Sequence, residues 1–264
     1  MGQFRTAMRV LREDGVSKAV RLTGRNIGRW YRTGSDSSGV RVVRLDGCRF
    51  ALDHPAISEE NVKDLVDNVH ERAERRLCSQ FLNPALPVIE LGGNMGVVSC
   101  VVNRRLTDPR AHTCVEPNPH LTPLLDANRR RNGCQFTIVE AAIAYGSETV
   151  ELNLDENPLT SRVGVGGASS IVVRAITLQS LVQQSAFKWS SLIMDVEGAE
   201  VDVISNEIDL LRRSFECLII EFHDHLRGAD ANADAIERLQ EAGFRKLGQV
   251  RGTIAMRNSA RPGA

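Results

Sequence analysis

Two short segments of this 264-residue chain carry residues that could hold a nucleoside. Residues 88–96 read VIELGGNMG, an apolar run that ends in glycines, and Glu116 follows a second apolar run. A glycine loop lets the backbone approach a ligand closely because no Cβ stands in the way. A carboxylate at the end of the next parallel strand is well placed to accept the hydroxyls of a ribose. Together the two segments predict a nucleoside site.

The spacing of the glycines discriminates between nucleosides. A dinucleotide loop needs three glycines in the pattern G-x-G-x-x-G. With Gly92 as the first, the other two positions hold Asn94 and Val97, so the pattern fails. Glu90 at the strand end would repel a pyrophosphate and attract an ammonium group. S-adenosylmethionine carries an ammonium, a sulfonium and a ribose but no phosphate, so it matches this loop better than NAD does. A glycine turn without a ligand is the alternative.

A second group of chemically active residues follows two later apolar runs. Asp195 ends the first run and Glu197 comes just after it, while the second run delivers Glu221 and His223. Alternation along a strand places Glu221 and His223 on the same side. Bringing several carboxylates to one sheet edge is costly unless a proton or a cation needs them. This grouping therefore indicates a functional site.

The order of apolar runs predicts the elements that position these residues. We predict seven strands, at 88–91, 111–116, 136–140, 191–195, 217–223, 244–248 and 252–257. We predict helices between them, near 96–105, 120–131, 177–184, 200–212 and 231–242. Such alternation implies an α/β fold with a mostly parallel sheet covered on both faces. The last two strands are too close in sequence for a crossover, so they must form a C-terminal antiparallel hairpin.

A long connection interrupts this alternation. Thr149 to Leu154 and Ile171 to Ile176 are predicted as a strand pair, and they flank the small-residue stretch Gly164 to Ser170. That stretch is either a ligand-contacting loop or a flexible one. It lacks the following Lys-Ser/Thr of a phosphate loop.

The first 85 residues are predicted as a separate helical and hairpin extension, before a main domain at 86–258 and a flexible tail at 259–264. Basic residues recur every three or four positions up to Arg32. They form either a solvated helix face or a contact with an anionic membrane surface. Asp46-Gly47 predicts a hairpin over 40–52. Ser58 is the expected N-cap of one helix that continues to Leu77.

Composition narrows the class of protein and its surroundings. Lys plus Arg equal Asp plus Glu at 33 each, which gives no charge-based reason to expect a nucleic-acid partner. No apolar run is long enough to span a membrane, and the amino terminus lacks the apolar core of a secretory signal. The six cysteines form no C-x-x-C pair, so we expect reduced, buried side chains, no zinc site and a cytoplasmic protein, with the inner membrane face as an alternative location.

Residues from Val88 to His223 resemble the FkbM-type S-adenosylmethionine-dependent methyltransferases. Five segments match in order: ELGGNMG (90–96), EPNP (116–119), Asn128, DVEGAE (195–200) and IIEFH (219–223). The chain departs from the family pattern at Glu90, Gly93 and Met194, where Asp, Ala and Lys are frequent. The resemblance implies a Rossmann-like methyltransferase fold and methyl transfer, most often to a hydroxyl of a sugar, glycan or other secondary metabolite.

The resemblance also implies roles for individual residues. Glu90 would hold the methionine ammonium group and Glu116 the ribose hydroxyls, while Glu140 either reaches the adenine amino group or caps a turn. The full set of implied cofactor-binding residues is Glu90, Gly92, Gly93, Asn94, Gly96, Glu116, Pro117, Asn118, Glu140, Ala141 and Asp195.

A sugar hydroxyl is a weak acid, so the reaction needs a base or a metal ion near the methyl group. Asp195 is the first candidate for the base and His223 the second, with Glu197 and Glu221 orienting them or binding a metal. Magnesium between Asp195 and Glu221 stays an open alternative.

Two other functions stay open on the sequence alone. One is an NAD(P)-dependent oxidoreductase on a related sheet, which the missing glycines argue against. The other is a non-catalytic adaptor that uses the fold as a partner surface. The expected partner of an enzyme is a small-molecule or glycan acceptor, bound by residues from 1–85 and 155–175, and a homo-oligomer is left open.

Overall fold

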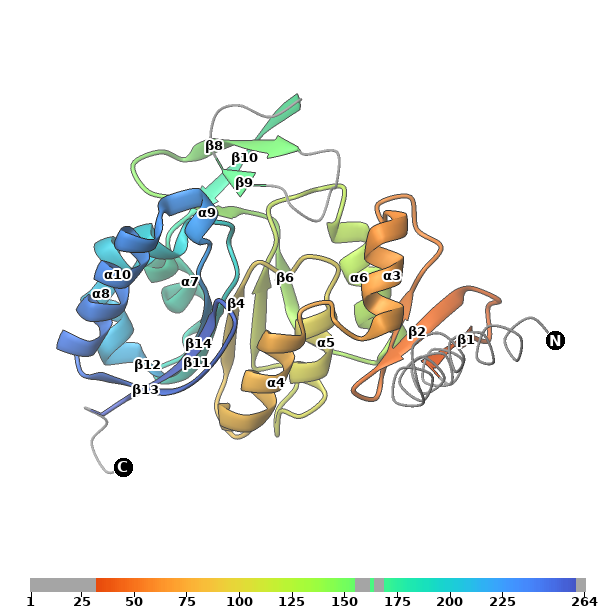
Figure 1. Cartoon of the computed structure of the whole chain (residues 1–264), viewed down its shortest axis with the longest axis horizontal. Helices are drawn as coiled ribbons and strands as arrows, with labels where there is room; N and C mark the ends of the chain where they lie inside the picture. Colours follow the sequence, from red (N-terminus) through yellow and green to blue (C-terminus); the bar gives the residue numbers. More distant parts are fainter. Residues whose placement is uncertain (1–31, 155–161, 164–168, 260–264) are drawn as a thin grey trace, which may run out of the picture. The chain divides into compact units, whose positions relative to one another are not determined.

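The computed structural model describes residues 32–154, 162–163 and 169–259 (Figure 1). The chain forms two compact units that divide between His70 and Glu71, whereas the sequence predicted a boundary near residue 85. The basic amino-terminal segment, residues 164–168 of the small-residue stretch and residues 260–264 of the predicted tail lie outside the described residues.

The first unit contains a three-stranded antiparallel sheet and one helix. Its strands are β1 (Thr33–Ser35), β2 (Arg41–Leu45) and β3 (Cys48–Ala51), and its helix is α3 (Glu59–Asp67). The predicted hairpin is confirmed: Asp46 and Gly47 join β2 to β3 with φ of 47° and 83°, the positive values that a tight hairpin turn requires. The predicted N-cap is confirmed too, because the Ser58 side chain accepts a hydrogen bond from the backbone of Asn61.

The single helix predicted from Ser58 to Leu77 is wrong. Two helices replace it, α3 in the first unit and α4 (Arg72–Phe81) in the second. Asn68 and Glu71 adopt left-handed conformations, with φ of 61° and 46°, and the helical path ends between them. Asparagine tolerates this conformation at a helix carboxyl end. The apolar periodicity continued across the break, so periodicity alone did not show it.

The second unit is built on a seven-stranded sheet. In spatial order its strands are β13 (Phe244–Val250), β14 (Thr253–Asn258), β12 (Phe215–Glu221), β11 (Ser190–Met194), β4 (Val88–Leu91), β5 (His112–Val115) and β6 (Thr137–Val139). The sheet is parallel except for β14, which runs antiparallel to both of its neighbours. This arrangement confirms the predicted sheet and its carboxyl-terminal hairpin.

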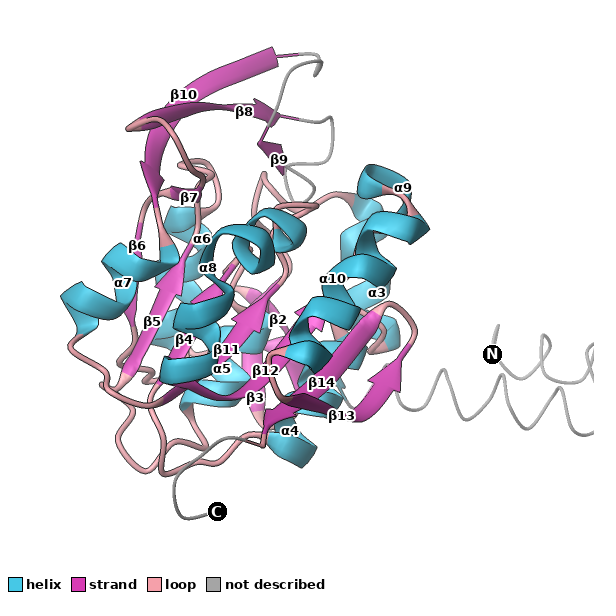
Figure 2. Ribbon diagram, turned by 90° about the vertical axis from the view of Figure 1, so that its left-hand side faces the viewer, coloured by secondary structure: helices cyan, strands magenta, loops and turns pink. Residues whose placement is uncertain are grey.

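Helices cover both faces of this sheet (Figures 1 and 2). One face carries α4, α5 (Val97–Asn103) and α6 (Thr122–Arg131), and the other carries α7 (Leu178–Ser185), α8 (Glu200–Ser214) and α10 (Ala229–Glu241). The short helix α9 (Asp224–Arg227) follows β12. Because both faces are covered, the central strands are buried throughout, as continuous apolar runs indicate. None of the helices in the described part of the chain has the length and apolar composition needed to cross a membrane.

A second, four-stranded sheet lies beyond the carboxyl ends of the parallel strands (Figure 2). Its order is β7 (Ala142–Ile143), β10 (Ser169–Ile176), β8 (Thr149–Leu154) and β9 (Arg162–Val163). The antiparallel pairing of β8 with β10 confirms the predicted strand pair. This small sheet places apolar side chains above the edge at which the sequence predicted a ligand.

The six cysteines are all buried and unbridged, as the sequence predicted. Their burial agrees with the behaviour of a reduced cysteine as a small apolar side chain.

Candidate functional site

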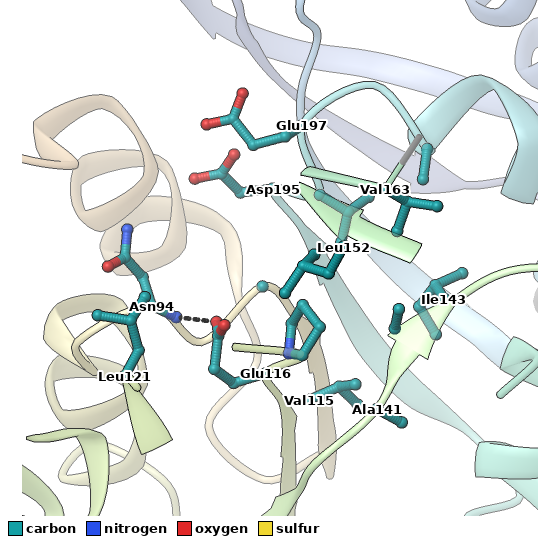
Figure 3. A pocket seen from close by; sticks show the side chains of 15 residues that line it. Asn94, Val115, Glu116, Leu121, Ala141, Ile143, Leu152, Val163, Asp195 and Glu197 are labelled. Atoms are coloured by element: carbon teal, nitrogen blue, oxygen red, sulfur yellow. Dashed lines mark hydrogen bonds between the residues drawn. The ribbon is translucent and has the colours of Figure 1, made fainter. Parts of the chain in front are cut away.

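A pocket of about 610 Å³ opens at the carboxyl ends of β4, β5 and β11 (Figure 3). Parallel strands present their carboxyl ends at one edge of the sheet, which is the usual ligand position in such folds. The pocket is lined by Gly92, Asn94, Val115, Glu116, Pro117, Leu121, Ala141, Ala142, Ile143, Leu152, Val163, Asp195, Val196, Glu197 and Ala199. The two segments that the sequence singled out therefore meet in one cavity.

The glycine loop after β4 is packed tightly against its neighbours. A Cβ on Gly92, where φ is 90°, would overlap the backbone carbonyl oxygen of Asp195. A Cβ on Gly93 would overlap the sulfur of Cys114. Gly96, with φ of 86°, is the N-cap of α5. Of these three glycines only Gly92 lines the pocket, so the other two serve mainly the packing of the loop.

Glu116 is a buried carboxylate at the pocket wall, only 4% exposed. One of its oxygens accepts the backbone N–H of Asn94 at 2.7 Å (Figure 3). The other accepts that of Asn118 at 2.8 Å. Burial raises the pKa of Glu116 to about 7, against the lowering effect of these two bonds. The glycine loop after β4 is held by a further hydrogen bond, which the Asn128 side chain donates to the carbonyl of Met95 at 2.9 Å. Glu116 is thus fixed in place by backbone N–H groups of two different loops.

Two of the acids that the resemblance assigned to the cofactor lie outside the pocket lining. Glu90, 1% exposed, pairs with the equally buried His112, with 3.0 Å between Oε2 and Nε2. His112 lies on the neighbouring strand β5, and Glu90 is not among the residues that line the pocket. Glu140 is exposed. Pro117 and Ala141, which follow β5 and β6, do line the pocket. Glu90 and Glu140 do not line it.

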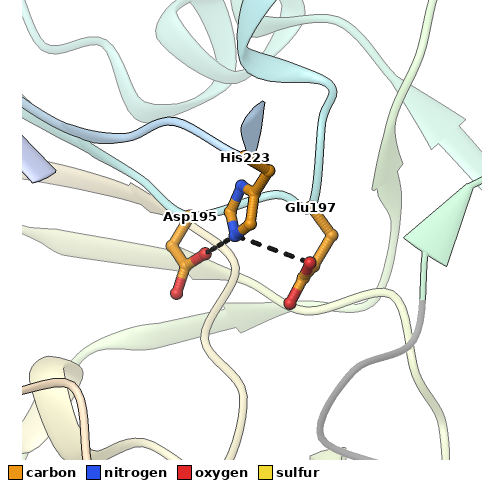
Figure 4. Close-up of side chains that lie close together, drawn as sticks. All are labelled: Asp195, Glu197 and His223. Atoms are coloured by element: carbon orange, nitrogen blue, oxygen red, sulfur yellow. Dashed lines mark ion pairs between the residues drawn. The ribbon is translucent and has the colours of Figure 1, made fainter. Parts of the chain in front are cut away.

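Asp195, Glu197 and His223 come together on the opposite wall (Figure 4). His223 Nε2 lies 3.5 Å from an oxygen of Asp195 and 3.5 Å from an oxygen of Glu197. The two carboxylate side chains are 22% and 26% exposed and line the pocket, whereas the imidazole, 10% exposed, lies behind them. The sequence anticipated that these three residues share an edge, and the structure shows them within reach of one ligand.

Glu200 holds the imidazole from the other side. Its oxygens accept the backbone N–H groups of Val196 and Gly198, each at 2.9 Å, and it lies 3.1 Å from His223 Nδ1. Burial alone would lower the pKa of His223, but the bond to Glu200 and the charges of Glu200, Glu197 and Glu221 raise it to about 9. Glu200 therefore fixes the orientation of the ring.

Two further acids reach this wall from α4. Glu74, 3% exposed, accepts a hydrogen bond from the Thr253 hydroxyl, and Thr253 pairs with Glu221 across β14 and β12. Burial followed by the charge of Glu74 raises the pKa of Glu221 to about 8. Burial followed by Glu221, Glu74 and Glu71 raises the pKa of Asp195 well above its usual value. Neighbouring acids thus raise the pKa values of Asp195 and Glu221.

Glu71 and Glu74 were not anticipated as site residues. A weak signal did exist, since Glu74 shares a helix face with Ala73, Leu77 and Cys78, all of which are buried. An acid on the apolar face of a helix must find a polar partner. The sequence alone did not show that this partner would be Thr253 on β14.

The family of the chain follows from a comparison of its sequence with family models. A model of the FkbM methyltransferase domain matches residues 90–246. The chain belongs to this methyltransferase family. The match spans the glycine loop, Glu116 and the acidic wall, so the family pattern and the pocket coincide. A search of curated protein sequences finds no match.

Several solved structures are similar to this chain at low sequence identity. Precorrin-6y C5,15-methyltransferase from Geobacter metallireducens is 13% identical over 82% of this chain and 97% of that one, with a TM-score of 0.46. TYW2 of P. horikoshii, solved in complex with MeSAdo, is 15% identical over 84% and 70%, with a TM-score of 0.41. A protein of the NADB-Rossmann superfamily from Streptococcus agalactiae is 9% identical over 72% and 69%, with a TM-score of 0.43. At these identities and TM-scores, the similarities say nothing about the chemistry of this FkbM-family chain.

Proposed function

We propose that the chain transfers a methyl group from S-adenosylmethionine to a hydroxyl oxygen of a sugar, glycan or other secondary metabolite. The observation that carries the proposal is the charge of the pocket. Among the described residues that line it, three are acidic, Glu116, Asp195 and Glu197, and none is Lys, Arg or His. Such a wall attracts the ammonium and sulfonium groups of this donor. It repels the pyrophosphate of a dinucleotide, which argues against the NAD(P)-dependent oxidoreductase.

The shape and lining of the pocket fit the rest of the donor. Glu116, held by two backbone amides, is a suitable acceptor for the ribose hydroxyls. The apolar side chains of Pro117, Leu121 and Ile143 offer a surface for the adenine ring.

Bound S-adenosylmethionine supplies the methyl group, and the chain supplies alignment and a proton acceptor. The acceptor oxygen forms its bond to the methyl carbon as the carbon–sulfur bond breaks and its electron pair passes to sulfur. The hydroxyl proton goes to Asp195. The raised pKa of Asp195 makes its ionised form a stronger base than an exposed carboxylate. His223 lies beside Asp195, and Glu200 orients its ring through Nδ1.

Calorimetry tests the donor. We expect S-adenosylmethionine and S-adenosylhomocysteine to bind the full-length chain, and NADH not to bind. Glu116→Gln should weaken binding of S-adenosylhomocysteine by roughly 1 to 3 kcal/mol, the cost of losing charged hydrogen bonds. Glu237→Gln, a matched change at an exposed position on α10, serves as the control. Binding of NADH alone would favour the oxidoreductase, and binding of none of the three would favour the adaptor.

The acceptor needs its own experiment. A donor with a labelled methyl group, offered with a panel of sugars, glycans and hydroxylated metabolites, should label the hydroxyl oxygen of at least one of them. Matched amine and carbon acceptors complete the panel. Label on nitrogen or carbon acceptors alone would contradict the hydroxyl part of the proposal and leave the donor part standing.

A further inference from the structure

His223 Nε2 forms ion pairs with Asp195 and Glu197 that are longer than charge-assisted hydrogen bonds (Figure 4). Charge-assisted hydrogen bonds from nitrogen to a carboxylate are about 2.7 to 2.9 Å long, but His223 Nε2 stands 3.5 Å from each carboxylate. One ligand atom from each residue lies within 4.8 Å of the other two. Atoms that share one cation at about 2.1 Å stand roughly 3.0 to 4.2 Å apart. The spacing suits a shared cation better than direct hydrogen bonds.

The imidazole is oriented as a metal ligand would be. A histidine that binds a metal through one nitrogen usually donates the other N–H to a carboxylate, which fixes the ring. Here Glu200 takes that place, 3.1 Å from Nδ1, and is itself held by the backbone amides of Val196 and Gly198. Glu200 is only 1% exposed. This leaves Nε2 directed at the gap between Asp195 and Glu197.

The residues around Asp195 supply negative charge, and the pocket gives an ion access to it from solvent. Glu221, Glu74 and Glu71 act on Asp195 electrostatically, and a cation would offset the cost of crowding these carboxylates. Asp195 and Glu197 are each about a quarter exposed and line the open pocket, so an ion can reach them from solvent.

We propose that Asp195, Glu197 and His223 bind one divalent metal ion on the pocket wall. One imidazole nitrogen with two carboxylates suits Mn²⁺ better than Mg²⁺, which favours oxygen ligands alone. This ligand set replaces the pair Asp195 and Glu221 that the sequence left open, because Glu221 lies against Glu74 and Thr253.

The role of the ion rests on the proposed function, whereas its binding does not. Beside the methyl group the ion would hold the acceptor hydroxyl and make it more acidic. Asp195 ligates through one carboxylate oxygen and keeps the other for the hydroxyl proton.

Titration with Mn²⁺ tests the site in the absence of any donor. Full-length protein treated with EDTA is titrated with Mn²⁺, and free Mn²⁺ is followed by electron paramagnetic resonance. We expect one ion per chain, with binding weakened at least tenfold by Glu197→Gln and by His223→Asn. Glu148→Gln and Glu237→Gln, two changes at exposed positions outside the pocket lining, should bind Mn²⁺ within a few-fold of the wild type. Thermal unfolding confirms that each variant is folded.

Three results would overturn the proposal. They are no binding of Mn²⁺ by the wild type at millimolar concentration, equal binding by all four variants, and a loss in Glu148→Gln as large as that in Glu197→Gln. Calorimetry with S-adenosylhomocysteine on the same samples separates the two proposals. Mn²⁺ binding without nucleoside binding would contradict the methyl donor alone, and nucleoside binding without Mn²⁺ binding would contradict the metal site alone.

Discussion

The two walls of the pocket hold their carboxylates in opposite ways. On the donor wall, Glu116 is held by the backbone N–H of Asn94, in the loop after β4, and by that of Asn118, in its own loop. On the opposite wall, Asp195 lies among acids from α4, β12 and its own loop, whose charges raise its pKa. The carboxylate of the first wall is held by backbone N–H groups, whereas the carboxylate of the second lies close to other acids. We therefore expect changes on the first to affect binding and changes on the second to affect chemistry.

The largest expected effect is on the rate. Asp195→Asn removes the proton acceptor, and general-base catalysis is worth roughly 10²- to 10⁴-fold. We expect methyl transfer to an identified acceptor to fall by this factor, while the dissociation constant for S-adenosylhomocysteine changes only a few-fold. Single-turnover transfer of a labelled methyl group measures the first quantity and calorimetry the second. An unchanged rate would remove Asp195 as the base, and an equal loss of affinity would remove the division between the walls.

A glycine substitution tests the contact that joins the two walls. Gly92→Ala places a Cβ on the carbonyl oxygen of Asp195 and also forces alanine to a φ of 90°. Gly146→Ala is the matched control, since Gly146 has φ of 82° but open space around it. We expect the control to cost about 1 kcal/mol of unfolding free energy. Gly92→Ala should cost roughly 3 kcal/mol or more and abolish donor binding.

Chemical denaturation and calorimetry of both glycine variants provide the comparison. Equal losses of unfolding free energy would show that backbone strain alone matters. In that case the close approach of the Gly92 loop to Asp195 would not contribute to stability.

The donor wall should show a pH dependence of its own. The pKa of Glu116 is raised to about 7 by burial, so this carboxylate, the proposed acceptor of the ribose hydroxyls, becomes protonated below that pH. We expect affinity for S-adenosylhomocysteine to be highest above pH 8 and to fall by up to about tenfold per pH unit below 7. Glu116→Gln should flatten this profile. The same slope in both proteins would assign the titration to another group.

The acidic wall should show its pH dependence in stability. The pKa of Glu221 is raised from 4.5 to about 8, by burial and then by Glu74. Since the folded state holds this proton more tightly than the unfolded chain, its contribution to stability is lost as pH rises through 8. Glu74→Gln should lower the pKa of Glu221, so its melting temperature should fall less between pH 6 and 9 than that of the wild type. Parallel melting curves across this range would show that the two acids do not interact.

For a change at Glu140 we expect no effect on the binding of the donor. Glu140 is exposed and outside the pocket lining, so Glu140→Gln should leave the affinity for S-adenosylhomocysteine unchanged. A clear loss would restore the role at the adenine that the sequence resemblance implied for this residue.

The features that the sequence predicted are those that depend on near neighbours in the chain. All seven strands of the large sheet and the hairpin turn at Asp46-Gly47 follow from apolar runs and turn residues. The left-handed residues Asn68 and Glu71 were missed because the apolar stripe continued past them. A conformational break of this kind changes the direction of the chain without changing its hydrophobic pattern.

The residues of the candidate site also fall into two groups, those whose position is decided by near neighbours in the chain and those whose position is decided by distant contacts. Glu116, Asp195 and Glu197 were located because each follows an apolar strand directly. Glu90 also ends a strand, but its partner His112 belongs to the neighbouring strand, and the sequence does not reveal such cross-strand pairs. Glu74 reaches the site only because α4 packs against the last strands of the sheet. Contacts between distant segments decide these details.

A crystal structure with S-adenosylhomocysteine bound tests the central claim most directly. We expect the ribose hydroxyls within hydrogen-bond distance of Glu116, the adenine between the apolar side chains of the pocket, and the sulfur directed toward Asp195. The nucleoside elsewhere on the chain, or a diphosphate bound beside Gly92, would contradict the claim that this acidic pocket receives a methyl donor.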